Sequence, residues 1–374
     1  MLPPKVMIIS SVHSWDDPRI FFREALSLAK RYHVEVHALA PFKEEWHAGI
    51  KVVGLPHRKP WARPLQWFTL GRRALASRAQ LISFHDPDLL FLALFLRLCG
   101  REVIYDVHEL VAEDILTKKW LPAFLRPGVR WLYKLIAGAA MPVLSAVVGA
   151  SRPISAAYRH RRKAVVRNYP PLELFSGPAD SVPPFAQGET LRLIYSGSLQ
   201  RARGITEMLE ACGQLPPNLS YHLDIVVQWP RDSEYATRLE SALKPVADRV
   251  TLHGWMQFPD VVRLMSTAHI GLVCTQPNAS DPLGSPLKLF EYMAAGLGIV
   301  VADFDEWRHL TVPYAAAARI DASSPGEIAG GIVAVADILC SVAGSGIDRS
   351  RRYSWSSEEQ TLLELYSQLL PVAA

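Results

Sequence analysis

Residues 285–302 combine residue types that suit the binding of a phosphate group. They read SPLKLFEYMAAGLGIVVA, in which Ser285 and Pro286 precede good helix formers, a glycine and a β-branched run. Proline is favoured in a first helical turn and glycine at a helix end, so the segment predicts a loop, a helix and a buried strand. A helix start carries free N–H groups and partial positive charge, to which Lys288 adds a full charge. Glu291, one turn later, could accept hydrogen bonds from ribose hydroxyls, although a plain core helix explains the pattern equally well.

Polar side chains also follow two predicted strands in the first half of the chain. His85 comes directly after the apolar run at residues 81–84, and His108 and Glu109 follow the run at residues 103–106. Ligands of doubly wound sheets lie beyond the carboxyl ends of the strands, so these side chains are candidates for a site. A lone histidine is more often structural, and Glu109 could equally brace a loop.

The order of predicted elements places these residues in two α/β domains. Strands at residues 5–11 and 34–39 enclose a loop and a helix at residues 20–32, and a strand from residue 191 leads into a helix at residues 205–214. Strand–helix–strand order is typical of a doubly wound parallel sheet. The chain of 374 residues is long enough for two such domains.

A stretch rich in proline and glycine separates the two predicted domains. We predict an N-terminal domain at residues 1–175 and a linker at residues 176–190. A second domain then follows at residues 191–354, with a final helix at residues 355–374.

Formal charge is divided unevenly between the two halves. The net charge of the chain is +4, yet residues 1–175 carry +12 and the remainder carries −8. Basic and aromatic residues that alternate in the first half predict a face for an anionic membrane surface. Nucleic acid is not expected, because no nucleic-acid-binding motif accompanies the charge; a solvated face over core aromatics is the other alternative. The residues are Trp61, Arg63, Trp67, Phe68, Arg72, Arg73, Lys118, Lys119, Trp120, Phe124, Arg126, Arg130, Trp131, Tyr133 and Lys134.

Cysteine usage and apolar runs bear on the compartment. Four single cysteines without a C-x-x-C pair argue against a disulfide framework or a zinc site and predict a reducing compartment. The first apolar run is too short for a secretory signal, and Pro142 splits the uncharged stretch at residues 135–151. We expect a cytoplasmic protein, peripheral on the inner face of the plasma membrane.

Residues 286–308, PLKLFEYMAAGLGIVVADFDEWR, resemble the donor-nucleotide segment of GT-B glycosyltransferases of the large retaining family four. The resemblance implies that Glu291 holds the ribose of a sugar nucleotide. Many members carry a second glutamate eight positions upstream, where this chain has Leu283. The closing string YSW…LLELY resembles the last helix of the fold, which crosses back onto the N-terminal domain.

Three strings in the first half resemble the same family: SVHSWDDPRI, HDP and YDVHEL. The resemblance implies that His85 contacts the transferred sugar or the acceptor. It also implies that His108 and Glu109 belong to the acceptor or catalytic site. Arg19, in the first of these strings, is a candidate for an acceptor contact, and a salt-bridged helix start is the alternative.

The loop after the strand at residue 191 resembles the family's G-R-L…K-G loop, which supplies an arginine and a lysine to the donor diphosphate. Gly197 and Gly204 match the pattern, Arg203 stands at the lysine position, and Ser198 replaces the arginine. Arg201 could compensate, since arginine grips phosphate oxygens in a bidentate way.

The Asp-x-Asp pattern that binds manganese in the other major transferase fold occurs twice, at residues 86–88 and 303–305. Such short patterns recur by chance, so we predict no metal site at either place. Asp86 and Asp88 are expected to cap the following helix.

We therefore predict two Rossmann-like α/β domains that face each other across a cleft, and a retaining transfer of a sugar from a UDP- or GDP-linked donor. The acceptor would be lipid-linked or a surface polysaccharide. No cofactor or metal is expected, because Arg203, Lys288 and the helix start would stabilise the leaving diphosphate. A nucleotide-sugar epimerase of the same fold and a non-catalytic nucleotide-sugar-binding subunit are the alternatives.

Overall fold

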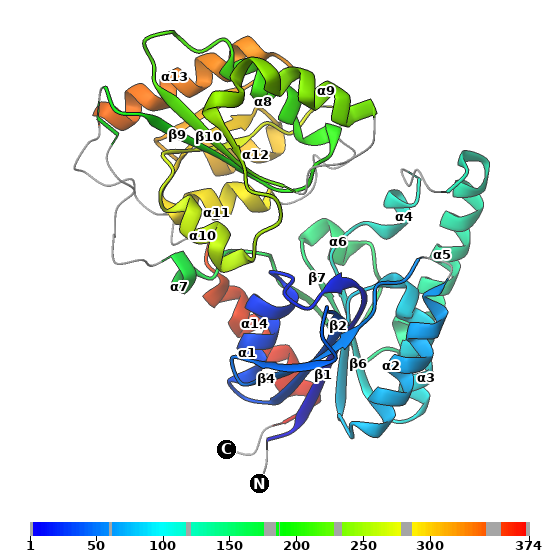
Figure 1. Ribbon diagram of the computed structural model, residues 1–374. Helices are drawn as coiled ribbons and strands as arrows, with labels where there is room; N and C mark the ends of the chain where they lie inside the picture. The colour runs from blue at the N-terminus through cyan, green and yellow to red at the C-terminus, as the bar shows by residue number, and fades with distance from the viewer. Residues whose placement is uncertain are drawn as a thin grey trace. The chain divides into compact units, whose positions relative to one another are not determined.

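The structure, a computed structural model, describes residues 3–59, 62–116, 121–175, 185–186, 188–227, 234–277, 286–341 and 353–371. Contacts divide the chain into two compact units, drawn in Figure 1. The first unit comprises Met1–Asn168 and Trp355–Ala374, and the second comprises Tyr169–Ser354. The first unit thus ends before the predicted boundary at residue 175, and most of the predicted linker at residues 176–190 lies outside the described residues.

The first unit is built on an eight-stranded sheet in the order β3-β4-β2-β1-β5-β6-β7-β8. Its described pairings are parallel, except that β3 runs antiparallel to β4. Nearly continuous apolar runs in the central strands suit a parallel sheet that is covered on both faces. The strands are β1 (Lys5–Ser14), β2 (His33–Leu39), β3 (Glu44–His47), β4 (Ile50–Leu55), β5 (Leu81–Phe84), β6 (Glu102–Val107), β7 (Ala146–Gly149) and β8 (Lys163–Val165).

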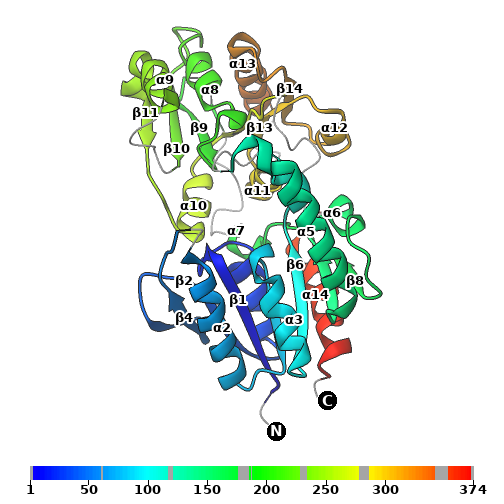
Figure 2. The same ribbon diagram turned by 90° about the vertical axis from the view of Figure 1, so that its right-hand side faces the viewer.

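Helices cover both faces of this sheet. One face packs against α2 (Pro64–Ala76), α3 (Leu90–Leu98) and α5 (Arg126–Ala140), and Figure 2 shows α2 and α3 in front of the strands. The other face packs against η1 (Ile20–Ala25), α1 (Leu26–Ala29) and α14 (Trp355–Leu369). Shorter helical segments are η3 (Pro87–Leu89), α4 (Val111–Asp114), η4 (Ala123–Leu125), η5 (Met141–Val143) and α6 (Arg152–Ala156).

Helix α14 belongs to the first unit although it follows the whole second unit in the sequence. Trp355 donates its indole N–H to Ser27 Oγ at 2.8 Å, and the Glu358 carboxylate accepts the backbone N–H of Arg167 at 2.7 Å. Tyr366 is fully buried in the same core. The predicted return of the final helix to the N-terminal domain is confirmed.

The second unit contains a six-stranded parallel sheet in the order β11-β10-β9-β12-β13-β14. Two α/β units with mostly parallel sheets confirm the predicted fold class. Its strands are β9 (Leu191–Ser196), β10 (Tyr221–Val226), β11 (Val250–Leu252), β12 (Ile270–Val273), β13 (Gly298–Ala302) and β14 (Ala317–Ile320). Its helices are α7 (Leu172–Phe175), η6 (Arg201–Arg203), α8 (Ile205–Cys212), α9 (Glu234–Leu243), η7 (Lys244–Arg249), α10 (Phe258–Met265), α11 (Leu287–Ala295), α12 (Asp305–Thr311) and α13 (Pro325–Ser341).

Helix α11 and strand β13 form where the sequence predicts them. The helix ends at Gly296, whose φ of 76° is a left-handed conformation that favours glycine. A Cβ atom at Gly271 on β12 would lie 2.3 Å from the ring of Tyr292, so glycine there lets α11 approach the sheet closely. Among the described helices, none is both long and apolar enough to cross a bilayer.

Candidate functional site

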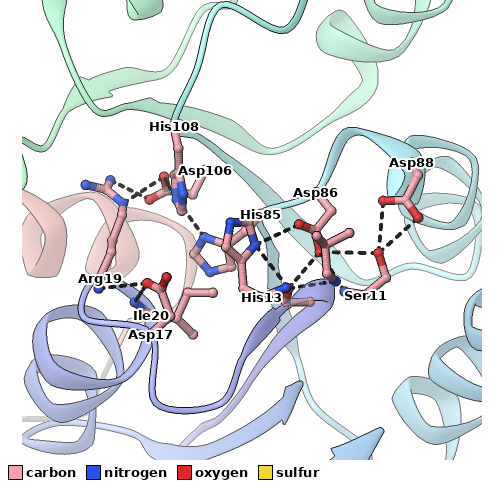
Figure 3. Close-up of polar contacts among 12 residues, drawn as sticks. Ser11, His13, Asp17, Arg19, Ile20, His85, Asp86, Asp88, Asp106 and His108 are labelled. Atoms are coloured by element: carbon pink, nitrogen blue, oxygen red, sulfur yellow. Dashed lines mark hydrogen bonds and ion pairs between the residues drawn. The ribbon is translucent and has the colours of Figure 1, made fainter. Parts of the chain in front are cut away.

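The carboxyl ends of three adjacent strands in the first unit bring together histidines and carboxylates (Figure 3). His13 lies on β1, His85 and Asp86 follow β5, and Asp106 and His108 lie on and just after β6. In a parallel sheet these ends meet at one edge, which is where ligands of such folds bind. The predicted residues His85 and His108 therefore lie side by side, with their rings 5.0 Å apart between centroids.

His13 and Asp86 form an ion pair at the edge of this cluster. His13 Nδ1 lies 2.8 Å from Asp86, which also accepts hydrogen bonds from Ser10 Oγ at 2.7 Å and from the Ser11 backbone N–H at 2.6 Å. Burial alone would lower the pKa of His13, but the hydrogen bond and charge of Asp86 outweigh it and raise the pKa to about 9. His13 is therefore a cation at neutral pH, and its side chain is 33% exposed.

The predicted helix caps at Asp86 and Asp88 are wrong. No side chain caps the start of η3. Asp86 instead binds His13 and the end of β1, while Asp88 accepts hydrogen bonds from Ser11 Oγ and from the indole N–H of Trp67, each at 2.9 Å. Trp67 is thereby held half-buried against the core of the first unit.

His85 lies beneath the surface of the cluster. Its side chain is 0% exposed, its Nδ1 lies 3.0 Å from His108 Nε2, and its Nε2 lies 3.7 Å from a Glu24 carboxylate oxygen. Burial, reinforced by His108, lowers the pKa of His85 to about 3, so the ring is neutral. The side chain of His85 is enclosed by protein, and the contact with the sugar or the acceptor that the resemblance implies stays a prediction. His13 and His108 are the histidines of the cluster that reach the solvent.

Arg19 holds the base of the cluster together. Its guanidinium contacts Glu24 and Asp106 at 2.8 Å each and donates to the Val166 carbonyl at 2.8 Å, and the residue is only 3% exposed. Arg19 thus makes the internal ion pairs of a salt-bridged helix start, and its contact with an acceptor stays a prediction. Burial raises the pKa of Glu24 well above its usual value, whereas the Arg19 charge lowers the pKa of Asp106 despite burial.

Four of these residues have the donor types of a metal site. Glu24, His85, Asp106 and His108 each offer one ligand atom, all within 4.8 Å of one another. Arg19 already contacts both carboxylates, so a divalent cation would have to displace a guanidinium from two ion pairs. These ion pairs disfavour a bound cation, and the absence of a metal site stays a prediction. Glu109, exposed just after β6, adds its charge to those that raise the pKa of His13.

The predicted donor-binding residues of the second unit lie at the carboxyl edge of its sheet. Strand β9 is followed by Gly197, Ser198, Arg201 and Arg203. Pro286 precedes α11, the next helix in the sequence after β12, and β12 is the neighbour of β9 in the sheet. The Ser196 backbone N–H donates to the Tyr292 hydroxyl at 3.1 Å, which fixes α11 against the end of β9. Ser285 and Leu283 lie outside the described residues.

Positive charge at this edge is only partly neutralised. Lys288 Nζ lies 2.7 Å from the buried carboxylate of Glu291. The Arg201 guanidinium lies 5.9 Å from the ring centroid of Tyr235, and the Arg203 charge opposes the burial that raises the pKa of Tyr195. Neither arginine has an ion-pair partner in the described part of the chain. At the other Asp-x-Asp pattern, Arg308 contacts Asp303 at 2.9 Å and Asp305 at 2.7 Å.

Sequence reasoning missed His13. It lies inside the string SVHSWDDPRI, but the predicted first strand ends at residue 11, whereas β1 continues to Ser14 and carries the histidine to the sheet edge. The available signal was a histidine two residues beyond a predicted strand end.

Comparisons with known proteins agree with this fold. Residues 190–337 match the family model described as Glycosyl transferases group 1. Sucrose-phosphate synthase from Thermosynechococcus elongatus has a TM-score of 0.71 and 16% identity, with 99% of this chain and 100% of that chain covered. HepE from Anabaena, in complex with UDP and glucose, has a TM-score of 0.66 and 16% identity, with 98% and 100% covered.

A UDP-forming α,α-trehalose-phosphate synthase from Burkholderia xenovorans has a TM-score of 0.64 and 12% identity, with 100% of each chain covered. No curated protein is similar enough in sequence to match. At these identities the likeness concerns the fold. The chain therefore has the fold of the GT-B glycosyltransferases, and its second unit contains the segment that matches glycosyl transferases group 1.

Proposed function

We propose that the chain is a glycosyltransferase that moves a sugar from a nucleotide-diphosphate sugar to a lipid-linked or surface-polysaccharide acceptor, with retention of configuration. The observation that carries this proposal is the set of cations at the carboxyl edge of the second sheet, Arg201, Arg203 and Lys288, beside the start of α11. HepE, of similar fold, was solved with UDP and with UDP-glucose, which supports a UDP-linked donor here.

The chemical problem is the charge on the leaving group. As the bond between the sugar and the diphosphate breaks, negative charge accumulates on the phosphate oxygens. Positive groups fixed in advance around those oxygens stabilise the transition state more than the ground state. We assign this work to Arg203 and Lys288 with the helix start, without a metal. Glu291, whose carboxylate is buried beside Lys288, would accept the ribose hydroxyls.

In the first unit we assign acceptor binding to His13 and His108. The protonated His13 can donate a hydrogen bond to an acceptor oxygen, and His108 is held by Asp106 at 3.0 Å. His85, neutral and buried, would act as a positioning residue by fixing the His108 ring. Glu109 remains a candidate at the same edge.

We further propose that the first unit docks on an anionic membrane on the cytoplasmic side. Helix α3 packs between α2 and α5, and these helices and the segment before α5 present large apolar side chains that are 48% to 83% exposed. Arg126, Arg130 and Lys134 on α5 add positive charge, although Glu113 contacts Arg130 at 2.7 Å and Lys134 at 3.7 Å and neutralises part of it. An unpaired lysine or arginine is worth about 1 kcal/mol near such a surface. The apolar side chains are Phe68, Phe91, Phe95, Leu98, Phe124, Trp131, Leu132 and Leu135.

The membrane proposal is tested by flotation with vesicles of anionic or neutral lipid. The protein should float with anionic vesicles, and replacing Trp131 and Leu135 by alanine should reduce the fraction of protein that floats. Trp46→Ala is the matched control, because Trp46 is also exposed but lies on β3. If the unchanged protein did not float, this would count against membrane docking. If Trp46→Ala also lost flotation, this would count against the surface of α2, α3 and α5 as the docking face.

The catalytic proposal is tested by incubation with a panel of nucleotide sugars. A transferase should hydrolyse its own donor slowly to free sugar and nucleoside diphosphate, and NMR should show retained anomeric configuration in the released sugar. An epimerase would release UDP and the sugar epimer without an acceptor. A non-catalytic subunit would raise the melting temperature with a donor yet never turn it over.

A further inference from the structure

A cavity of about 860 Å³ lies in the first unit, away from the histidine cluster. It is bounded by β2, β4, α2 and the loop that leads into β3, and no residue of the histidine–carboxylate cluster lines it. Its volume is within the range of roughly 300–1,000 Å³ that is typical of sites for small molecules. Neither the donor site nor the membrane face proposed above uses it.

The charged groups of the cavity leave a surplus of positive charge. Glu35 and Glu44 are each neutralised by a lysine at 2.7 Å, Lys5 and Lys51 respectively. Lys43 and Arg73 also line the cavity, and within the described residues neither has a carboxylate at ion-pair distance. Arg73 donates one hydrogen bond, to the Gly54 carbonyl at 3.3 Å. Two cations therefore remain to be neutralised.

A buried histidine adds an unused polar group to the same wall. His37 on β2 is 4% exposed and lines the cavity, and neither ring nitrogen has a hydrogen-bond partner in the described part of the chain. Its Nε2 lies 3.5 Å from Glu35. Burial lowers the pKa of His37; the contact with Glu35 and its charge oppose this, and the charges of Arg73 and Lys5 act in the same direction as burial. A neutral imidazole at this place can donate one N–H to a ligand oxygen.

We propose that this cavity binds a small metabolite that carries a phosphate monoester. A phosphate monoester has a charge of about −1.5 to −2 at neutral pH, which matches the two unpaired cations. Arginine offers two parallel N–H donors to phosphate oxygens, and Lys43 adds a point charge. The apolar part of the lining, with Phe42, Val53 and Leu55, would hold the carbon skeleton.

The proposal is tested by isothermal titration calorimetry of the full chain with glucose 6-phosphate and with inorganic phosphate. Arg73→Gln combined with Lys43→Gln should weaken binding by at least about tenfold, because charge-assisted hydrogen bonds are lost. Arg72→Gln is the matched control, since Arg72 is the exposed neighbour on α2 and does not line the cavity.

A second pair of variants separates this cavity from the donor site. Arg203→Gln with Lys288→Gln should leave the binding of glucose 6-phosphate unchanged, while the binding of UDP should weaken. No binding by the unchanged protein, equal binding by the Arg73 and Lys43 variant, or loss of binding only in the Arg203 and Lys288 variant would each overturn the proposal. Binding only to vesicles that contain phosphatidate would likewise overturn it, in favour of a lipid headgroup.

Discussion

The carboxyl edges of the two sheets place charge in opposite ways. In the first unit the charged side chains are paired and, apart from His13, buried, as Arg19 with Glu24 and Asp106 and His13 with Asp86 show. In the second unit Arg201 and Arg203 lie at the edge without an ion-pair partner in the described residues. The first edge is thus assembled by the protein alone, whereas the second leaves positive charge for a ligand. We expect substitutions of the buried, paired residues at the first edge to cost stability and substitutions of the arginines at the second edge to cost activity.

The largest effect is expected at the second edge. Replacing Arg203 and Lys288 together by alanine should lower kcat/KM by about 10³- to 10⁵-fold, because one preorganised donor is typically worth 10²- to 10³-fold. Steady-state kinetics with the donor found in the panel measures this. The melting temperature should hardly change, and Arg263→Ala, an exposed arginine on α10, should be silent in both assays. Unchanged turnover in the double variant would remove the basis of the assigned site.

Arg19→Ala should cause the next largest effect, in stability. It leaves the buried Asp106 carboxylate without its cation and Glu24 without its ion-pair partner, which typically costs about 3–5 kcal/mol in the free energy of unfolding. Urea unfolding followed by tryptophan fluorescence measures the loss. Arg31→Ala, at an exposed position after α1, should change the free energy of unfolding by less than about 0.5 kcal/mol. If Arg19→Ala left the free energy of unfolding unchanged, the ion pairs of the first edge would contribute less to stability than their contacts indicate.

Gly204→Ala should lower the free energy of unfolding by roughly 2–3 kcal/mol, because it strains the backbone and introduces a clash in the loop of the second edge. Gly204 has φ +70°, and an added Cβ would lie 2.2 Å from the Cys274 carbonyl oxygen. Donor affinity by calorimetry and the melting temperature should both fall. Gly138→Ala in α5 has open space around the new Cβ and should stabilise by about 0.5–1 kcal/mol, the usual gain inside a helix. Equal effects at both glycines would contradict the loop geometry.

The smallest effect concerns the pH dependence of the first edge. Because the pKa of His13 rises from 6.5 to about 9 on folding, its pair with Asp86 stabilises fully below pH 6.5 and loses this contribution as pH rises through 9. After allowance for partial exposure we expect about 1–2 kcal/mol. Urea unfolding of the unchanged protein and of His13→Gln at pH 6, 8 and 10 should show the difference shrinking with pH. His57→Gln, at an exposed position, should show no such trend.

Local sequence signals predicted the backbone at both edges well. A proline and a glycine bound α11, and apolar runs that stop before polar residues mark the ends of β5 and β6. Each of these signals lies within a few neighbouring residues, so a single sequence is enough to recognise it. The fold class followed from the order of such elements together with the resemblance to a known family.

The depth and partners of side chains could not be predicted in the same way. His85 is enclosed because Glu24 from η1 and His108 from beyond β6 pack around it, and Arg19 is buried against Asp106 and Val166. These partners are far apart in sequence, and no local pattern encodes their meeting. Trp67 shows the same limit: an amphipathic helix predicts which side chains face the sheet, but not that one indole will bind Asp88.

Helix α14 has a consequence for how the protein is made. Leu362 and Tyr366 complete a core that also contains Ile8 and Val34, yet the ribosome must first synthesise all of residues 169–354. At the usual speed of translation this takes roughly 10–40 s. During that time one face of the first sheet lacks its covering helix and exposes apolar surface to the cell. We expect the nascent chain to depend on chaperones over this interval, and the first unit to fold last although its sequence emerges first.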